Sequence, residues 1–158
     1  MKKLLIVLAV ACSGAIGFAQ AMPNPYGLSV TLEAAKKIAL PALAEARKNS
    51  WNMAVAIVDA SGDLIYFEKM DNTQLGSVEI AMAKARAAVR FKRPTKVFQD
   101  QLAAGGEGLR TLGLIGVIPV EGGFPLIVDG KIAGGIGVSG GTSAQDAQCA
   151  KAAADQVK

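Results

Sequence analysis

Histidine is the side chain most often used for catalysis and metal binding near neutral pH, and this chain has none among its 158 residues. Its absence excludes Ser-His-Asp and Cys-His mechanisms and removes the usual zinc and haem ligands. Any chemistry must therefore rest on carboxylates, on cationic side chains, or on sulfur and phenol groups. Met70 and Asp71 stand out, because they lie together at the end of a predicted strand, where loops often carry sites.

Glycines in the C-terminal half form a second candidate site. Gly135, Gly137 and Gly140 have the GxGxxG spacing of the dinucleotide-binding fingerprint. That fingerprint requires a later strand that presents an acidic residue to the ribose, about 20 positions on. The printed sequence stops at Lys158, before such a strand. We therefore reject a dinucleotide site.

A site for a smaller anion remains open in the same region. Backbone N–H groups of residues 139–143, at the predicted start of a helix, could hold a carboxylate or a phosphate. The residues expected to line it are Gly122, Gly123, Ser139 and Gly140, with Lys84, Arg86 or Arg110 as charge partners. The alternative, which we favour, is that these glycines only allow tight turns and close packing of strand against helix.

The pattern of apolar residues predicts the elements that must position these groups. Helical spacing is found over residues 31–48, 76–91, 95–104 and 142–157, with Asp146 near the positive end of the last helix. Apolar or β-branched runs predict strands at 53–59, 64–69, 112–119, 124–129 and 131–138. Paired hairpins with segregated helices indicate the α+β class with an antiparallel sheet, in the order α-β-β-α-α-β-β-β-α.

The first residues predict export from the cytoplasm. Lys2 and Lys3 precede an uncharged apolar stretch of about 15 residues, and Ala19-Gln20-Ala21 forms a small-x-small cleavage site. The stretch is shorter than the roughly 20 residues that span a bilayer, so a signal peptide is favoured over a membrane anchor. We expect a signal peptide at residues 1–21, a loose N-terminal arm at 22–30, a single domain at 31–158, and a periplasmic or secreted location.

Composition narrows the partners of the processed chain. Loss of Lys2 and Lys3 leaves 15 basic against 13 acidic residues, so we expect neither nucleic acid nor an anionic membrane as partner. Cys149 is then the single cysteine, and an intramolecular disulfide is impossible.

Three stretches of sequence resemble the GlcG/HbpS family, which includes the C-terminal domain of PduO, and the likeness is greatest to its GlcG members. The first hairpin reads MAVAIVDASGDLIYFEKMD at residues 53–71, and a helix reads AMAKARAAVRFKRPT at 81–95. The most specific stretch is EGGFPLIVDGKIAGGIGVSGGTSAQD at 121–146, with the Gly-Gly-x-Pro, Asp-Gly and Gly-Val-Ser-Gly signatures of the family. The resemblance covers residues 31–157. It implies a five-stranded antiparallel sheet with helices packed on it.

The resemblance also implies a function, because some members of the family bind haem. We therefore expect an exported, non-enzymatic protein that binds a small ligand, with haem as the candidate cofactor. Without histidine, the residues left to ligate iron are Met53, Met70, Met82, Tyr26, Tyr66 and Cys149, of which Met70 is preferred because the others fit core or strand positions. The alternative is a small enzyme or auxiliary protein that acts on a small carboxylic acid through Asp71 and cationic partners.

Members of the family assemble from several copies, so the resemblance also implies a homo-oligomer. The mature chain is rich in Ala and Gly and has few aromatic residues for a large monomeric core. A helix–helix contact through Ala81, Ala85 and Ala88 would suit a subunit interface.

Overall fold

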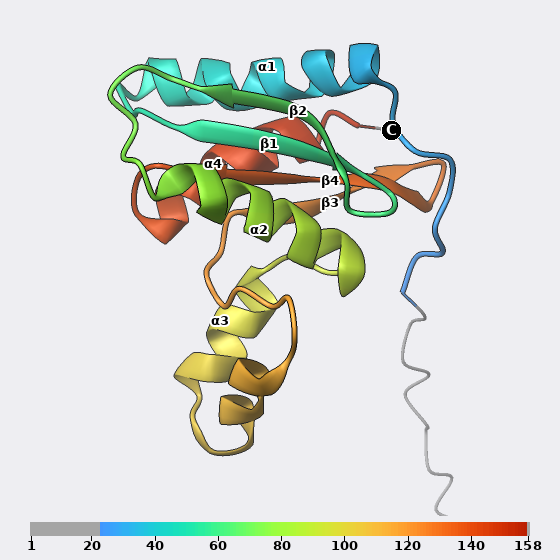
Figure 1. The fold of residues 1–158 in the computed structure, drawn as a ribbon, viewed down its shortest axis with the longest axis vertical. Helices are drawn as coiled ribbons and strands as arrows, with labels where there is room; N and C mark the ends of the chain where they lie inside the picture. The colour runs from blue at the N-terminus through green and yellow to red at the C-terminus, as the bar shows by residue number, and fades with distance from the viewer. Residues whose placement is uncertain (1–22, 158) are drawn as a thin grey trace, which may run out of the picture.

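An antiparallel sheet with the strand order β2-β1-β4-β3 forms the centre of the computed structural model, which describes residues 23–157. Helices α1 and α4 pack on one face of this sheet and α2 packs on the other (Figure 1). The α+β class and the antiparallel pairing predicted from the sequence are confirmed. The elements in chain order are α1 Leu32–Lys48, β1 Ala54–Asp59, β2 Leu64–Lys69, α2 Ser77–Arg90, α3 Lys96–Ala103, the 3-10 helix η1 Gly106–Gly113, β3 Gly123–Val128, β4 Lys131–Ser139 and α4 Ser143–Ala154.

Strand β1 is buried on both faces, and its side chains alternate between two cores. Val55 and Ile57 lie in the core shared with α1 and α4, whereas Ala56 and Val58 lie in the core shared with α2. A strand buried on both sides has a continuous apolar run in place of strict alternation. That is why the sequence identifies β1 so clearly.

Helix α2 lies unusually close to β4, because both elements present very small residues at the contact. A β-carbon at Gly137 would lie 2.0 Å from the carbonyl oxygen of Ala81 and 2.5 Å from the backbone nitrogen of Ala85. Ala81, Ala85 and Ala88 are all fully buried within the chain. The subunit contact expected from these three alanines is therefore wrong, since they are not on the surface.

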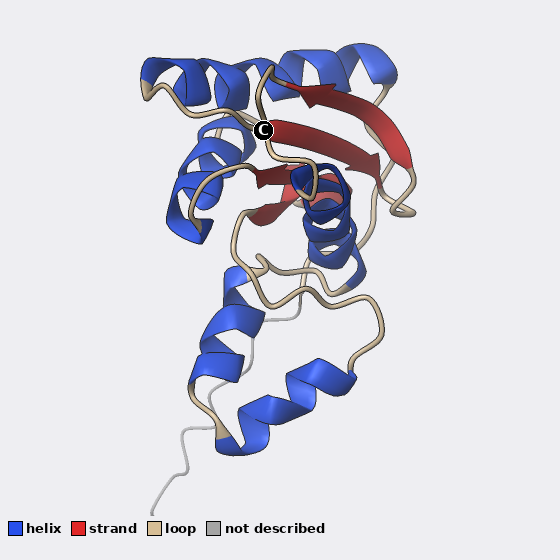
Figure 2. Cartoon of the chain, turned by 60° about the vertical axis from the view of Figure 1, so that its left-hand side comes forward, coloured by secondary structure: helices blue, strands red, loops and turns tan. Residues whose placement is uncertain are grey.

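Residues 95–120 form a lobe that projects from one side of the sheet and contains α3 and η1 (Figures 1 and 2). The strand predicted at 112–119 lies here and is wrong: the described residues form a sheet of four strands, not five. Leu112 and Ile115 are 67% and 94% exposed. The apolar run that suggested a strand is an exposed surface of the lobe, where it has no neighbouring strand to pair with.

The N-terminal arm is held to the sheet rather than loose. The Ile132 N–H donates to the carbonyl oxygen of Pro25 at 2.8 Å, and the Gly27 N–H donates back to Ile132 at 2.9 Å. Tyr26 thereby makes a single parallel bridge to β4, and its hydroxyl donates to the carbonyl oxygen of Val89 at 3.0 Å. The arm therefore pairs with β4 on the side of β1, just beyond the point where β1 ends.

The predicted signal peptide lies outside the described residues. Among residues 23–157, no helix is both long enough and apolar enough to cross a membrane.

Candidate functional site

One end of the sheet gathers most of the residues that the sequence suggested. Strand β1 begins and β2 ends there, and β3 begins beside the end of β4, because each neighbouring pair is antiparallel. The predicted site residues at this end are Met70, Asp71, Gly122, Gly123, Ser139 and Gly140. They divide into a buried cluster around Lys84 and an open polar pocket beside Met70.

The buried cluster is centred on an ion pair between helices that lie on opposite faces of the sheet. The Lys84 ammonium of α2 donates to Oδ2 of Asp146 in α4 at 2.7 Å and to the carbonyl oxygen of Val138 at 3.0 Å. Both side chains are closed off from solvent, with exposures of 0% and 4%. Burial lowers the pKa of Lys84, an effect that its hydrogen bond to Asp146 opposes, and burial likewise raises the pKa of Asp146. The pair links the two helical layers and is closed to a ligand.

Gly122 makes room for this ion pair. Its φ of +119° lies in the region that favours glycine, and a β-carbon there would lie 2.9 Å from the Lys84 ammonium and from the Asp146 β-carbon. Gly123 abuts the backbone of Lys84 in the same way, and its N–H donates to the Thr95 hydroxyl at 3.0 Å. The geometry at both glycines fits the packing role that the sequence analysis favoured.

Two N–H groups of the loop before α4, those of Gly141 and Thr142, already donate to side chains of α4. The Gly141 N–H donates to Oδ1 of Asp146 at 3.0 Å, and Thr142 and Gln145 bond each other reciprocally as a capping box. The Ser139 hydroxyl lies 3.2 Å from that of Ser77. An external anion would have to displace the chain's own carboxylate from this loop.

Two of the expected charge partners lie elsewhere, and the expectation that they join this site is wrong. Arg86 is at the opposite end of the sheet, where its Nε donates to the carbonyl oxygen of Gly62 at 3.2 Å and holds the β1–β2 turn. Arg110 is in the lobe, 2.6 Å from the Glu107 carboxylate. Proximity in sequence to Lys84 suggested Arg86, but two positions along a helix face different directions.

The open pocket beside Met70 is polar. It has a volume of about 390 Å³, and Arg47 and Glu68 form an ion pair of 3.5 Å within it. Every lining side chain except that of Met70 is charged or carries an amide, so the pocket offers little apolar surface to a ligand. Its lining is Arg47, Asn52, Glu68, Lys69, Met70, Asp71 and Asn72.

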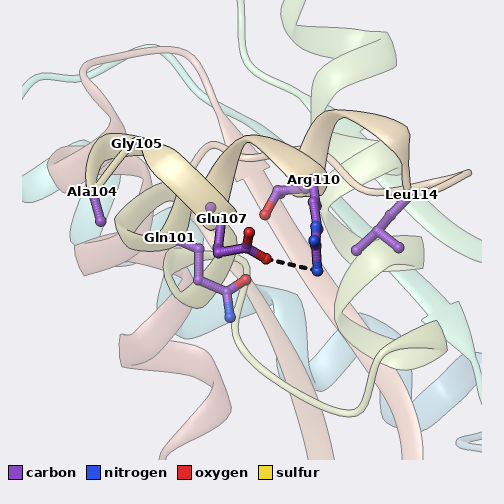
Figure 3. A pocket seen from close by; sticks show the side chains of 8 residues that line it. Gln101, Ala104, Gly105, Glu107, Arg110 and Leu114 are labelled. Carbon is purple, nitrogen blue, oxygen red and sulfur yellow. Dashed lines mark ion pairs between the residues drawn. The ribbon is translucent and has the colours of Figure 1, made fainter.

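A second hollow of about 500 Å³ lies within the lobe itself, between α3 and η1. Figure 3 shows the Glu107 and Arg110 side chains pairing across it, with Leu114 at one side and Ala104 at the other. Every residue that lines it belongs to the stretch 101–114, so this hollow is a local feature of the lobe.

The larger groove, of about 580 Å³, joins three elements that are far apart in the sequence. The beginning of α3, the edge strand β3 and the outer face of α4 enclose it. Its apolar residues are Pro94, Val97, Phe124, Ala144 and Ala147, and its polar residues are Lys96, Asp100, Glu121, Gln148 and Lys151. A mostly apolar concavity of this size with a few charged groups is the usual form of a site for an organic ligand.

The two lysines of the groove are exposed and able to reach a ligand. Lys96 Nζ lies 2.7 Å from Oδ1 of Asp100 and 4.0 Å from Oε2 of Glu121. Lys151 pairs with Asp155 one turn further along α4. Surface pairs of this kind contribute little to stability and can be exchanged for a ligand carboxylate at small cost.

No pattern in the sequence predicted this groove. Its signal was weak: Ala144, Ala147 and Lys151 recur at helical spacing, but on the face of α4 opposite the core. In the sequence, small apolar residues on the outer face of a helix are typical of solvent-exposed positions. Only the structure shows that residues of α3 line the same groove.

The predicted iron ligands are dispersed and lie outside the groove. Met53 and Cys149 are fully buried in the core, and burial raises the pKa of Cys149 to about 12. The Tyr66 hydroxyl is bonded to Glu68, and Met70 packs against the core at the margin of the polar pocket. Met82 is half-buried in the core on the α2 face.

Comparison with known proteins agrees with this architecture. Residues 30–155 match the family described as Haem degrading protein HbpS-like. Protein GlcG of Escherichia coli K12 is 39% identical over 95 residues, which covers 60% of this chain and 69% of GlcG. The structure of a double mutant of Streptomyces reticuli HbpS is 30% identical with a TM-score of 0.75, covering 96% of this chain and 99% of that one.

A further solved structure is a complex of PduOC with haem. It is 28% identical to this chain with a TM-score of 0.74, and the match covers 83% of this chain and 96% of PduOC. The resemblance drawn from the sequence is therefore confirmed, and the chain belongs to the HbpS-like family.

Proposed function

We propose that this chain is a non-enzymatic binding protein that holds a haem-type tetrapyrrole in the groove between α3 and α4. A haem presents a flat apolar ring with two carboxylate side chains on one edge. The groove offers an apolar lining from α3, β3 and α4, with Lys96 and Lys151 available for the carboxylates. The single observation that carries the proposal is this pairing of an apolar lining with exposed cations in a member of a haem-linked family.

The residues of the groove fit the ring and its acids, but they do not supply an iron ligand. When bound, the haem would bring its own redox and ligand-binding chemistry, while the chain would hold and orient the ring. The polar pocket beside Met70 suits the macrocycle less well, because the charged and amide side chains around it would lose water without gaining partners.

Replacing Ala147 with glutamate should weaken hemin binding at least tenfold, because a carboxylate would then face the ring and repel its acids. The measurement is a hemin titration followed by the Soret band. Ala104→Glu is the matched control, since it places the same charge in the hollow of the lobe. If Ala104→Glu or Met70→Ala abolishes binding while Ala147→Glu does not, the site lies elsewhere. If the wild type does not saturate, the proposal fails.

The binding should also leave the tetrapyrrole intact. The buried acid–base pair of Lys84 and Asp146 is closed to a ligand. The hydrogen bond from the Lys96 ammonium to Asp100 raises the pKa of Lys96, so this lysine stays protonated and cannot act as a base. Under a mild reductant the Soret band can shift once, as the ferric iron is reduced to ferrous, but its absorbance should then persist because the ring is intact. Decay faster than that of hemin bound to an unrelated carrier protein would indicate degradation and contradict the non-enzymatic assignment.

The alternative function, action on a small carboxylic acid, has less support. The cations suggested for it are engaged within the chain: Lys84 with Asp146 and Arg86 with Gly62. The N–H groups of the loop before α4 are also engaged.

Self-association through the lobe is part of the proposal. Leu112 and Ile115 expose apolar surface there, and neighbouring Leu109 and Leu114 extend it. Ile115→Asp combined with Leu112→Asp should convert the oligomer to a monomer in sedimentation experiments. Leu28→Asp, at a residue that is 93% exposed outside the lobe, should leave the mass unchanged. A wild type of monomer mass at micromolar concentration would contradict this proposal.

Export to the periplasm or medium, with cleavage after Ala21, is supported by the three-part layout of residues 1–21. N-terminal sequencing of the exported protein should start at Met22. A chain that stays in the cytoplasm with Met1 in place would contradict it.

A further inference from the structure

We infer that the groove recognises the ring and the acid side chains of a tetrapyrrole and is indifferent to the metal at its centre, so that metal-free porphyrins are ligands as good as haem. This inference rests on the proposed function, because it concerns the same groove. It adds a ligand class, porphyrin dicarboxylates without iron, that a haem site built around an iron ligand would discriminate against.

The first argument is the chemistry of the lining. Proteins hold haem iron through the imidazole of His, the thioether of Met, the thiolate of Cys or the phenolate of Tyr. None of these groups is among the ten residues that line the groove. The lining consists of aliphatic carbons, one phenyl ring, one amide, two carboxylates and two ammonium groups.

The Met, Cys and Tyr side chains of the described residues also lie away from the groove: Met53, Met70 and Met82 pack in or against the two cores. Cys149 lies on α4, like the groove, but on its inner face, where it is fully buried in the core. Tyr26 donates its hydroxyl to the carbonyl oxygen of Val89, and Tyr66 donates to Glu68. Bringing any of them to the groove would require removing it from these contacts.

The lysines do not substitute as ligands. An amine coordinates a metal only through its lone pair, and the Lys96 ammonium donates to both carboxylate oxygens of Asp100 at 2.7 and 2.9 Å. Lys151 donates in the same way to Asp155. Protonated amines attract the carboxylates of the ligand and contribute nothing to its metal.

Binding energy must then come from contact with the ring and from the two lysines. Removing the iron changes neither the apolar surface of the ring nor its carboxylates. Esterifying the carboxylates removes the charge that the lysines recognise. The groove should therefore discriminate strongly between an acid and an ester, and weakly between haem and metal-free porphyrin.

The test compares hemin, protoporphyrin IX and protoporphyrin IX dimethyl ester in equilibrium titrations with the purified protein, followed by quenching of its single tryptophan, Trp51. We expect the dissociation constants of hemin and protoporphyrin IX to agree within about threefold, and the ester to bind at least tenfold more weakly. Lys96→Ala combined with Lys151→Ala should weaken both acids but not the ester. Lys37→Ala combined with Lys131→Ala, which removes two exposed lysines outside the groove, is the control.

Each result separates the inference from the proposed function. Tight hemin binding with protoporphyrin IX weaker by more than about thirtyfold would overturn the inference and leave the proposed function standing. Failure of both acids to bind, or equal binding by wild type and Ala147→Glu, would overturn the proposed function. As an independent readout, free imidazole should shift the Soret band of bound hemin, because no protein side chain fills the iron's ligand position. An unchanged band would overturn the inference.

Discussion

Replacing Lys84 with methionine should lower the free energy of unfolding by about 3–5 kcal/mol, because it leaves the Asp146 carboxylate buried without its cation. The methionine fills much of the space that the lysine stem occupied, so the loss comes from charge rather than from a cavity. Urea unfolding, with the midpoint and slope fitted together, measures it. The matched control is Lys36→Met, at a half-exposed surface pair, which should change stability by no more than about 0.5 kcal/mol.

The double variant Lys84→Met with Asp146→Asn distinguishes charge from shape. Asparagine removes the uncompensated charge and can still accept from the Gly141 N–H, as Asp146 does at 3.0 Å. The double variant should therefore be more stable than Lys84→Met alone. If the losses in free energy of unfolding of Lys84→Met and Asp146→Asn, measured separately, simply add in the double variant, the ion pair does not couple α2 to α4 as its geometry indicates.

Gly137→Ala should be strongly destabilising for a change that adds only one methyl group, with a loss of about 3 kcal/mol. The added carbon would lie 2.0 Å from the carbonyl oxygen of Ala81, so α2 must move away from β4 to admit it. The movement would open the tightest helix–sheet contact in the core. Thermal or urea unfolding measures the loss. Weaker packing should also lower the slope of the free energy of unfolding against urea concentration.

Gly76→Ala is the control for this change. Gly76 precedes α2, has an ordinary φ of −61°, and has no heavy atom within 4 Å of the position of an added β-carbon. Its replacement should cost less than about 1 kcal/mol. Equal effects at Gly76 and Gly137 would mean that α2 is not seated against β4 as closely as described.

The sequence predicted the elements well wherever burial and local turn chemistry agreed. The helices predicted at 31–48 and 142–157 are present and are capped by Thr31 and Thr142, and the Asp129–Gly130 turn joins β3 to β4. The prediction failed for residues 112–119, because apolar side chains signal burial only on average, and Ile115 is exposed. The periodicity of a sequence does not show whether an apolar run has a neighbouring strand to pair with.

The candidate site was predicted less completely. Glycines and Lys84 were singled out for a ligand, and the structure brings them together around Asp146, inside the protein. The groove was missed because its apolar residues carry no catalytic chemistry and lie about a third of the chain apart, such as Val97 and Ala147. Such a surface depends on the position of α3 relative to α4. Local sequence patterns predict each helix but not how two distant helices lie relative to each other.

The docking of the N-terminal arm on β4 determines an order of events during synthesis. Asn24 donates from its side chain to the carbonyl oxygen of Gly130 at 2.8 Å, across 106 positions of sequence. The Asn24 side chain cannot make this contact until the β3–β4 turn has left the ribosome. Contacts of such long range form late and slow the completion of the fold. The N-terminal arm therefore completes its contacts only after most of the chain has been made.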